Sequence, residues 1–264
     1  MPERIFYFGT NFKMHQTPEV SARFYRDLAA TVQPGDGVQR FMIPPVTSLA
    51  AVAAIARADD PDIWIGAQNM HWKDEGAFTG EISAPMLTSL GADLVLLGHA
   101  ERRRHALEQD AELNLKVLAG FRAGLRVLLC VGETAEERSY DVSEETVRRQ
   151  LKIGLHGLEP ADASRLLIGY EPVWSIGEGG TPASPEHVAP VVTAIRDCLR
   201  QVLGTAEEHV AVLYGGSVTP GNAAGFVTVP GIDGLFVGRS AWTVDGYHQT
   251  LQAGLRARNV GSRD

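Results

Sequence analysis

Residues 125–132, LRVLLCVG, decide the class of fold. Nearly every residue in this stretch is apolar, which is typical of a strand that is buried on both faces. Seven further runs of this kind occur in the chain. The eight runs begin near Arg4, Val38, Ile63, Asp93, Leu125, Arg165, His209 and Asp233. Dividing 264 residues by eight gives about 33 residues per run, the size of one strand, one helix and two turns.

Helical patterns separate these runs. Residues 17–19 (TPE) supply an N-cap residue, a proline suited to the first helical position and an acid that complements the helix dipole. Val20, Phe24 and Leu28 then recur every four residues, on one helical stripe. Residues 184–186 (SPE) repeat the signal before another apolar stripe. Strands that alternate with helices indicate a parallel sheet, and eight such units predict a closed (β/α)8 barrel.

Composition and charge narrow the classes of protein. No linker or change of composition divides residues 1–264, so a single domain is expected. The net charge is −8, from 24 basic and 32 acidic residues, whereas nucleic-acid binders carry a basic surplus. The longest apolar runs are too short to span a bilayer. The sequence therefore predicts no nucleic-acid or membrane partner.

The cysteines and the N-terminal residues predict the compartment. Cys130 and Cys198 are the two cysteines in the chain, too few for a disulfide framework, which favours a reducing compartment. The first residues lack the basic segment and apolar core of a signal peptide. A cytoplasmic location is expected.

Polar side chains follow several of the predicted strands. Asn11 and Lys13 follow the first run, His99 and Glu101 the fourth, and Glu171 the sixth. Each residue alone is more often a solvated charge or a hydrogen-bonded structural group. Catalytic groups of barrels lie at the carboxyl ends of the strands, so the placement of all five residues on one rim predicts an active site.

The residue types at this rim predict proton transfer. A carboxylate such as Glu171 can remove a proton next to a carbonyl group, while a neutral His99 and the Lys13 ammonium polarise that carbonyl. Glycine-rich turns around Gly216 and Gly238 expose backbone N–H groups suited to a phosphate. No cofactor or metal is expected, because zinc spacing, a Walker motif and a nucleophile elbow are all absent from the sequence. Cys130 could be a nucleophile, but a small apolar wall residue is favoured.

Seven segments of the chain resemble the triosephosphate isomerases. They are residues 11–14 (NFKM), 66–69 (GAQN), 76–83 (GAFTGEIS), 98–103 (GHAERR), 130–133 (CVGE), 170–174 (YEPVW) and 214–218 (YGGSV). They occur in order, each at the expected strand end or loop, and the resemblance extends over residues 8–251. It implies a (β/α)8 barrel and an isomerase of a small phosphorylated sugar that needs no cofactor.

The resemblance also implies a role for each site residue. Glu171 would be the base and His99 the neutral electrophile. Lys13 would be the cation facing the oxyanion. Asn11 would lie beside the substrate oxygen, and Glu101 would support Lys13. Phosphate contacts would come from Gly177, Gly216, Ser217, Gly238 and, where the family has a second glycine, Arg239.

Two longer segments would complete the site. Residues 172–182 resemble the lid, and its main positions are Pro172, Trp174, Ile176, Gly179 and Pro182. Residues 68–81 resemble a loop that enters a second subunit, with Gln68 at its start and Thr79 near the partner's catalytic residues. A homodimer is expected.

Several residues depart from the family pattern. Phe12 replaces the usual tryptophan, His15 an asparagine, and Ala100 a serine that holds the glutamate when the lid is open. Gly180 should loosen the second hinge of the lid and Pro182 should stiffen the residue after it. Residues 239–242 (RSAW) replace a turn of small residues.

These departures leave the substrate open. The lid and residues 238–242 (GRSAW) look like a branch associated with erythrulose phosphate isomerisation, a ketose-to-ketose shift on a four-carbon sugar. The main expectation is an ordinary glycolytic and gluconeogenic enzyme that interconverts dihydroxyacetone phosphate and glyceraldehyde 3-phosphate, and the erythrulose phosphate reaction is the alternative. A Schiff-base enzyme with Lys13 as nucleophile and a non-catalytic phosphosugar-binding barrel are further alternatives.

Overall fold

The structure is a computed structural model that describes residues 5–31, 37–59, 63–177 and 179–261. Eight parallel strands form a closed barrel in chain order, with β1 paired to β8. The strands are β1 (Phe6–Asn11), β2 (Val38–Ile43), β3 (Ile63–Ala67), β4 (Leu94–Leu97), β5 (Arg126–Val131), β6 (Leu166–Tyr170), β7 (Ala211–Tyr214) and β8 (Gly234–Val237). The predicted (β/α)8 barrel is confirmed.

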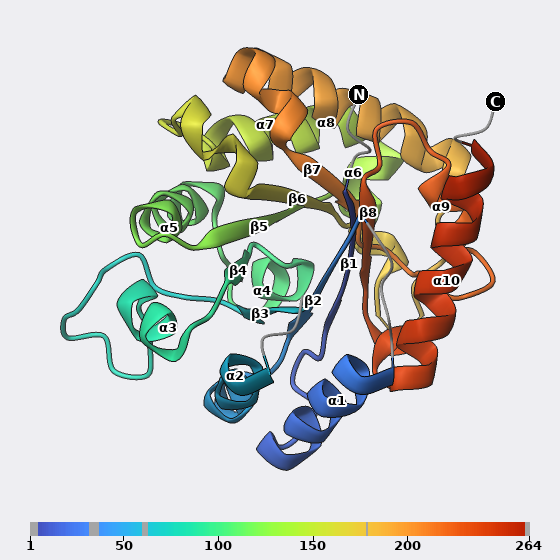
Figure 1. The fold of residues 1–264 in the computed structure, drawn as a ribbon. Coiled ribbons are helices and arrows are strands. Elements are labelled where there is room, and N and C mark those ends of the chain that lie inside the picture. The colour runs from blue at the N-terminus through green and yellow to red at the C-terminus, as the bar shows by residue number, and fades with distance from the viewer. Residues whose placement is uncertain (1–4, 32–36, 60–62, 178, 262–264) are drawn as a thin grey trace.

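Helices surround the barrel (Figure 1). The α-helices are α1 (Pro18–Thr31), α2 (Val46–Asp59), α3 (Ala84–Leu90), α4 (Ala100–His105), α5 (Asp110–Arg122), α6 (Ala135–Ser139), α7 (Ser143–Gly154), α8 (Pro185–Leu203), α9 (Ala223–Val227) and α10 (Val244–Gly261). Short 3-10 helices are η1 (Pro160–Arg165), η2 (Val173–Ser175), η3 (Gly204–His209) and η4 (Arg239–Ala241). Two α-helices follow β4 and two follow β5, and the first helix of each pair is short.

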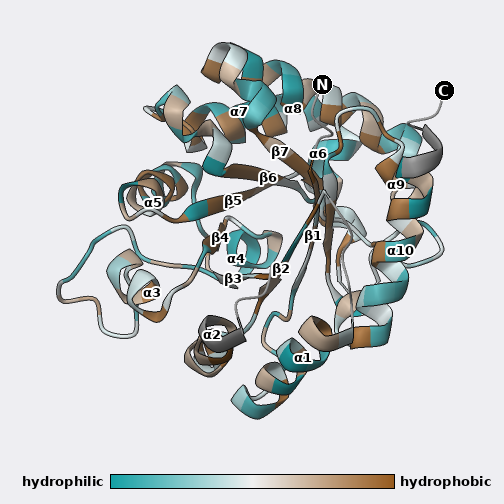
Figure 2. Cartoon of the chain, in the orientation of Figure 1, coloured by the Kyte–Doolittle hydropathy of each residue, from teal (hydrophilic) through white to brown (hydrophobic). Residues whose placement is uncertain are grey.

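The strands are apolar on both faces because each face packs against a different part of the core. In β5, Leu128 and Cys130 point into the barrel, where they pack with residues such as Phe41 and Phe236. Val127 and Leu129 belong to the larger cluster that packs the barrel against the helices. Figure 2 shows the strands as the most apolar part of the chain. The continuous apolar runs therefore reflect burial on two sides.

The segment between β3 and α3 extends away from the barrel (Figure 1). The His71 N–H donates to the Ile82 carbonyl oxygen at 2.7 Å, and the His71 ring packs between Trp72 and Phe78. The Phe78 side chain is nonetheless 41% exposed. The loop is thus held at its base and presents an apolar ring at its outer part.

In the described ranges, no helix is long and apolar enough to cross a membrane. Cys130 and Cys198 are free and buried. The cytoplasmic location stays a prediction.

Candidate active site

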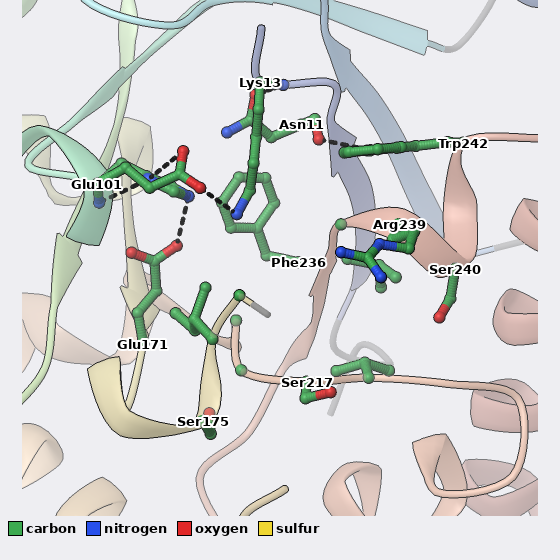
Figure 3. Close-up of a pocket in the computed structure, with 18 of the residues that line it drawn as sticks. Asn11, Lys13, Glu101, Glu171, Ser175, Ser217, Phe236, Arg239, Ser240 and Trp242 are labelled. Atoms are coloured by element: carbon green, nitrogen blue, oxygen red, sulfur yellow. Dashed lines mark hydrogen bonds and ion pairs between the residues drawn. The ribbon is translucent and has the colours of Figure 1, made fainter. Parts of the chain in front are cut away.

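A pocket of about 480 Å³ opens at the carboxyl ends of the strands. All the predicted catalytic and phosphate-binding residues line it: Asn11, Lys13, His99, Glu101, Glu171, Gly177, Gly216, Ser217, Gly238 and Arg239. Figure 3 shows Glu101 and Glu171 on one side and Arg239 and Trp242 opposite, with Lys13 above. The barrel therefore brings together residues from both ends of the chain.

The remaining predicted site residues divide between pocket and surroundings. Ile176 of the lid lines the pocket. The other lid and dimer-loop residues lie outside its wall, namely Pro172, Trp174, Gly179, Pro182, Gln68 and Thr79. Trp174 instead lines a neighbouring pocket behind the lid.

The His99 ring is held as a neutral donor. His99 is the N-cap of α4, and its Nδ1 atom accepts the N–H of Glu101 at 3.2 Å. A ring nitrogen that accepts a hydrogen bond carries no proton, so the proton lies on Nε2. Nε2 faces Glu171 Oε1 at 3.4 Å. The first turn of α4 thus fixes which atom of the ring can polarise a substrate oxygen.

Glu171 is a buried carboxylate held by the backbone. Glu171 is the first residue after β6 and is 2% exposed. Its Oε2 atom accepts the N–H of Ala100 at 2.9 Å. Ala100 has no side-chain hydroxyl to offer, so the backbone N–H of the same residue is the donor. Gly132 allows the Glu171 backbone to approach closely, since a Cβ there would lie 1.8 Å from the Glu171 carbonyl oxygen.

Lys13 occupies a strained backbone position. Its φ angle is +51°, which is uncommon for a residue with a side chain. The Asn11 Oδ1 atom accepts the Lys13 N–H at 2.9 Å, and Gln68 Nε2 donates to the Lys13 carbonyl oxygen at 2.8 Å. Gln68 also donates to Asn11 Oδ1 at 3.2 Å. The predicted dimer-loop residue Gln68 therefore also supports the Lys13 backbone within its own subunit.

The Lys13 ammonium is paired with Glu101. Nζ lies 2.7 Å from Glu101 Oε1. Partial burial would raise the pKa of Glu101, but the hydrogen bond and the charge of Lys13 outweigh it and leave the pKa below its ordinary value. Glu101 therefore stays ionised and holds the ammonium at the pocket mouth.

In the turn after β7, Gly216 has no room for a side chain. A Cβ at Gly216 would lie 2.2 Å from the Tyr214 hydroxyl oxygen and 2.8 Å from Ser175 Oγ. At Gly238, after β8, a Cβ would meet no atom within 4 Å. Gly216 is thus required by packing, whereas the space over Gly238 is open to a ligand.

The predicted lid is anchored at its first hinge. Trp174 Nε1 donates to Glu133 Oε1 at 2.7 Å, and the Arg138 guanidinium stacks 3.8 Å from the Trp174 ring centroid. Burial raises the pKa of Glu133 despite these contacts. Gly177 and Gly179 have φ angles of +89° and +83°, and Glu178 lies outside the described residues.

The second hinge contacts the first. The Thr181 N–H donates to the Trp174 carbonyl oxygen at 3.2 Å. A Cβ at Gly180 would lie 2.7 Å from the carbonyl carbon and oxygen of Ser175. The glycine that the sequence treats as a loose hinge therefore also permits close contact between the two ends of the lid.

Sequence reasoning did not place several pocket residues. Ser175, Thr219, Phe236, Ser240, Trp242 and His15 also line the wall. His15, Ser240 and Trp242 were recognisable only as departures from a family pattern. Phe236 lies within a predicted strand, and only the inward face of the closed barrel shows that it reaches the pocket.

Cys130 packs in the barrel interior and is not among the residues that line the pocket. Burial raises the pKa of its thiol well above the usual value, and the charge of Glu171 raises it further. A thiol that stays protonated is a poor nucleophile. The surroundings of this side chain therefore favour an apolar packing residue over a nucleophile.

The combined groups suit enediolate chemistry. A buried carboxylate, a neutral imidazole N–H and an ammonium meet in one pocket. The first can remove a proton from a carbon next to a carbonyl, and the other two can stabilise the negative oxygen that results.

Comparison with known proteins gives the family. The sequence model of the triosephosphate isomerases matches residues 6–254. A protein of Rhizobium etli named L-erythrulose-1-phosphate isomerase is 44% identical over 94% of this chain and 91% of its own length. Proteins with the same name from Mesorhizobium japonicum and Rhizobium meliloti are 45% and 42% identical, over 94% and 95% of this chain and 96% and 97% of theirs. This chain is an isomerase and belongs to the triosephosphate isomerase family.

Proposed function

We propose that this enzyme isomerises L-erythrulose 1-phosphate by moving its carbonyl group from carbon 2 to carbon 3. The observation that carries the proposal is where the chain departs from its family: His15, Arg239 and Trp242 line the pocket. The proposed chemical groups, Lys13, His99 and Glu171, keep the family pattern. Changed pocket-lining residues around unchanged proposed catalytic groups favour a changed substrate. The relatives that carry the name of this activity support it, at 41–45% identity.

The proposed reaction moves protons between neighbouring atoms. Glu171 removes the proton from carbon 3, and the electron pair of that C–H bond forms the carbon–carbon double bond of an enediolate. The oxygen on carbon 2 becomes negative and is stabilised by Lys13 and by the Nε2–H of His99. Glu171 then returns the proton to carbon 2, while the hydroxyl proton on carbon 3 passes to the negative oxygen on carbon 2, so that the oxygen on carbon 3 becomes the carbonyl and the oxygen on carbon 2 a hydroxyl. The product is again a ketose, because carbon 3 carries a hydroxymethyl group.

The phosphate end of the substrate would lie opposite Glu171. Backbone N–H groups around Gly177, Gly216, Ser217 and Gly238 can donate to phosphate oxygens, and Arg239 adds a positive charge on the same side. Closing the lid over the pocket would exclude water from the enediolate, which otherwise loses its phosphate.

We also propose a homodimer. Met14, next to Lys13, is 94% exposed, and Phe78 lies exposed on the extended loop. Thr79, beside Phe78, does not line the pocket of its own subunit. Two copies that exchange these loops would cover both apolar side chains and bring Thr79 to the partner's site. Sedimentation of the parent and of Thr79→Arg tests this: the parent should be dimeric and the variant monomeric and weakly active.

One assay separates the candidate substrates. The protein is offered L-erythrulose 1-phosphate and dihydroxyacetone phosphate in parallel, and kcat/KM is compared. We expect the four-carbon substrate to be preferred, with one deuterium incorporated at the former carbonyl carbon when turnover occurs in heavy water. A preference for dihydroxyacetone phosphate would instead support the triose reaction, which the unchanged Asn11, Lys13, His99 and Glu171 also favour.

Two further outcomes would remove the isomerase mechanism. Borohydride capture of substrate on Lys13 would indicate a Schiff base. Substrate binding without turnover, with the same affinity in the parent and in Glu171→Gln, would indicate a binding protein.

A further inference from the structure

The backbone carbonyl group of Asn11 points toward β8, one residue beyond the point where the pairing of β1 with β8 stops. The Phe12 N–H donates to the Ile43 carbonyl oxygen of β2 at 3.1 Å. Because C=O and N–H of a trans peptide point in opposite directions, the Asn11 carbonyl in the same peptide faces β8. The pairing of β1 with β8 stops at Thr10 and Val237, one residue earlier. This rim carbonyl therefore lies beyond the last strand pairing, in a residue that is 5% exposed.

A tryptophan side chain supplies the donor. Trp242 Nε1 donates to the Asn11 carbonyl oxygen at 2.8 Å. The chain has turned away after β8 through η4, and the indole N–H takes the place of a strand N–H at this point. In Figure 3, a dashed line joins the indole of Trp242 to Asn11 at the pocket wall. The side chain thus closes the seam between the first and the last strand.

A second side chain covers the indole. The His15 ring centroid lies 4.4 Å from that of Trp242, and the planes are inclined by 46°. His15 and Asn11 flank Lys13 in the same loop. The tryptophan therefore contacts the Lys13 loop on both sides of Lys13.

We infer that Trp242 is a positioning residue for the reaction, acting through Asn11 on Lys13. The Asn11 side chain holds the Lys13 N–H, and the Lys13 backbone is strained at φ +51°. Fixing the Asn11 carbonyl fixes the strand end from which this strained residue projects. The inference goes beyond the proposed substrate, since either sugar would place a negative oxygen at the same ammonium.

The test separates positioning from phosphate binding. Trp242→Phe keeps a ring against His15 and removes the N–H. A shift of about 1 Å in a reacting group can cost about a hundredfold, and we expect a partial shift to lower kcat about tenfold, with KM little changed. Binding is measured in parallel by calorimetry with 2-phosphoglycolate, which presents a carboxylate like the enediolate, and with inorganic phosphate. The variant should weaken the first about tenfold and leave the second unchanged.

Matched variants provide the controls. Trp64→Phe changes a tryptophan of β3 away from the pocket and should match the parent. His15→Asn removes the covering ring while keeping the indole N–H and should lower kcat less than Trp242→Phe. A raised KM with unchanged kcat, or equal weakening of 2-phosphoglycolate and phosphate, would assign Trp242 to phosphate binding and overturn the inference. Because the 2-phosphoglycolate measurement needs no turnover, it stands even where the proposed sugar proves wrong.

Discussion

The two ends of the barrel treat charged groups differently. At the amino ends of the strands, Asp233 pairs with Arg196 and accepts the Val212 N–H, and Arg196 also donates to the Val210 carbonyl oxygen. At the carboxyl ends, Glu171 is buried and faces His99, and Lys13 has a strained backbone. At the amino ends the charged pair lies away from the pocket, whereas at the carboxyl ends Lys13, Glu101 and Glu171 line it. We therefore expect the first group to contribute mainly to stability and the second mainly to the proposed chemistry.

The largest expected effect comes from removing the proposed base. Glu171→Gln should lower kcat roughly 10,000-fold, or about 5.5 kcal/mol in activation free energy, because general base catalysis is lost. The free energy of unfolding should not fall, since a buried charge is removed. Glu171→Asp, which moves the carboxylate back, should cost on the order of a hundredfold. Steady-state kinetics and urea unfolding measure both, and a Gln variant that keeps a tenth of the activity would contradict the assignment.

At the amino ends of the strands, a substitution should lower stability and leave kcat unchanged. Asp233→Ala leaves Arg196 buried without its main partner, and the free energy of unfolding should fall by about 3–5 kcal/mol. The folded variant should keep the kcat of the parent, because no pocket residue changes. Asp197→Ala, which breaks an exposed pair with Arg200, is the control and should cost about 1 kcal/mol or less. Equal losses from the two variants would remove the distinction between the ends.

Gly216 lies in the turn that is proposed to bind the phosphate, and its packing leaves no room for a side chain. Gly216→Ala places a methyl group against Tyr214 and Ser175, so the turn after β7 must shift. We expect KM for the phosphorylated substrate to rise about tenfold. Gly221→Ala is the control in the same loop, where the nearest atom is Thr219 Oγ1 at 3.8 Å. A shift in KM from both variants would point to general loosening of the loop.

Arg239 tests whether rim charge acts on the phosphate. Its side chain is exposed at the pocket mouth, and an exposed charge contributes about 1 kcal/mol, or about fivefold in KM. Arg239→Gly should therefore weaken phosphosubstrate binding or shift the preference between three- and four-carbon sugars, while Arg239→Lys should retain most of the binding. If Arg239→Gly matches the parent on both sugars, the departure at this position has another cause.

The smallest expected effect is the pH dependence of the Lys13–Glu101 pair. The pKa of Glu101 in the folded state lies below its usual 4.5. The stabilisation by this pair is therefore complete well above pH 4.5 and is lost as the pH falls through the lower folded pKa. Glu101→Gln should be less stable than the parent near neutral pH by about 1 kcal/mol or less. The difference should shrink in acid, and unfolding curves at several pH values measure it.

Local patterns in the sequence were enough for much of this molecule. The runs that became strands are apolar on both faces because two layers of core contact them, and the signals at residues 17–19 and 184–186 place the starts of α1 and α8. Asn11, Lys13, His99 and Glu171 could be selected because each follows a strand. The capping-box spacing of Thr134 and Glu137 marks the start of α6, whereas the short helix α4 was not foreseen, since it has too few residues for a periodic pattern.

The sequence by itself determined the barrel, its family and the rim that carries the polar groups, because hydrophobic periodicity and short motifs are local properties of the chain. Only the tertiary structure decided which groups meet. The N–H of Ala100 holds a carboxylate 71 residues away, and the Trp242 indole reaches a carbonyl 231 residues away. Such contacts exist only after the strands have paired into the barrel, and no local pattern specifies which groups that pairing brings within hydrogen-bonding distance.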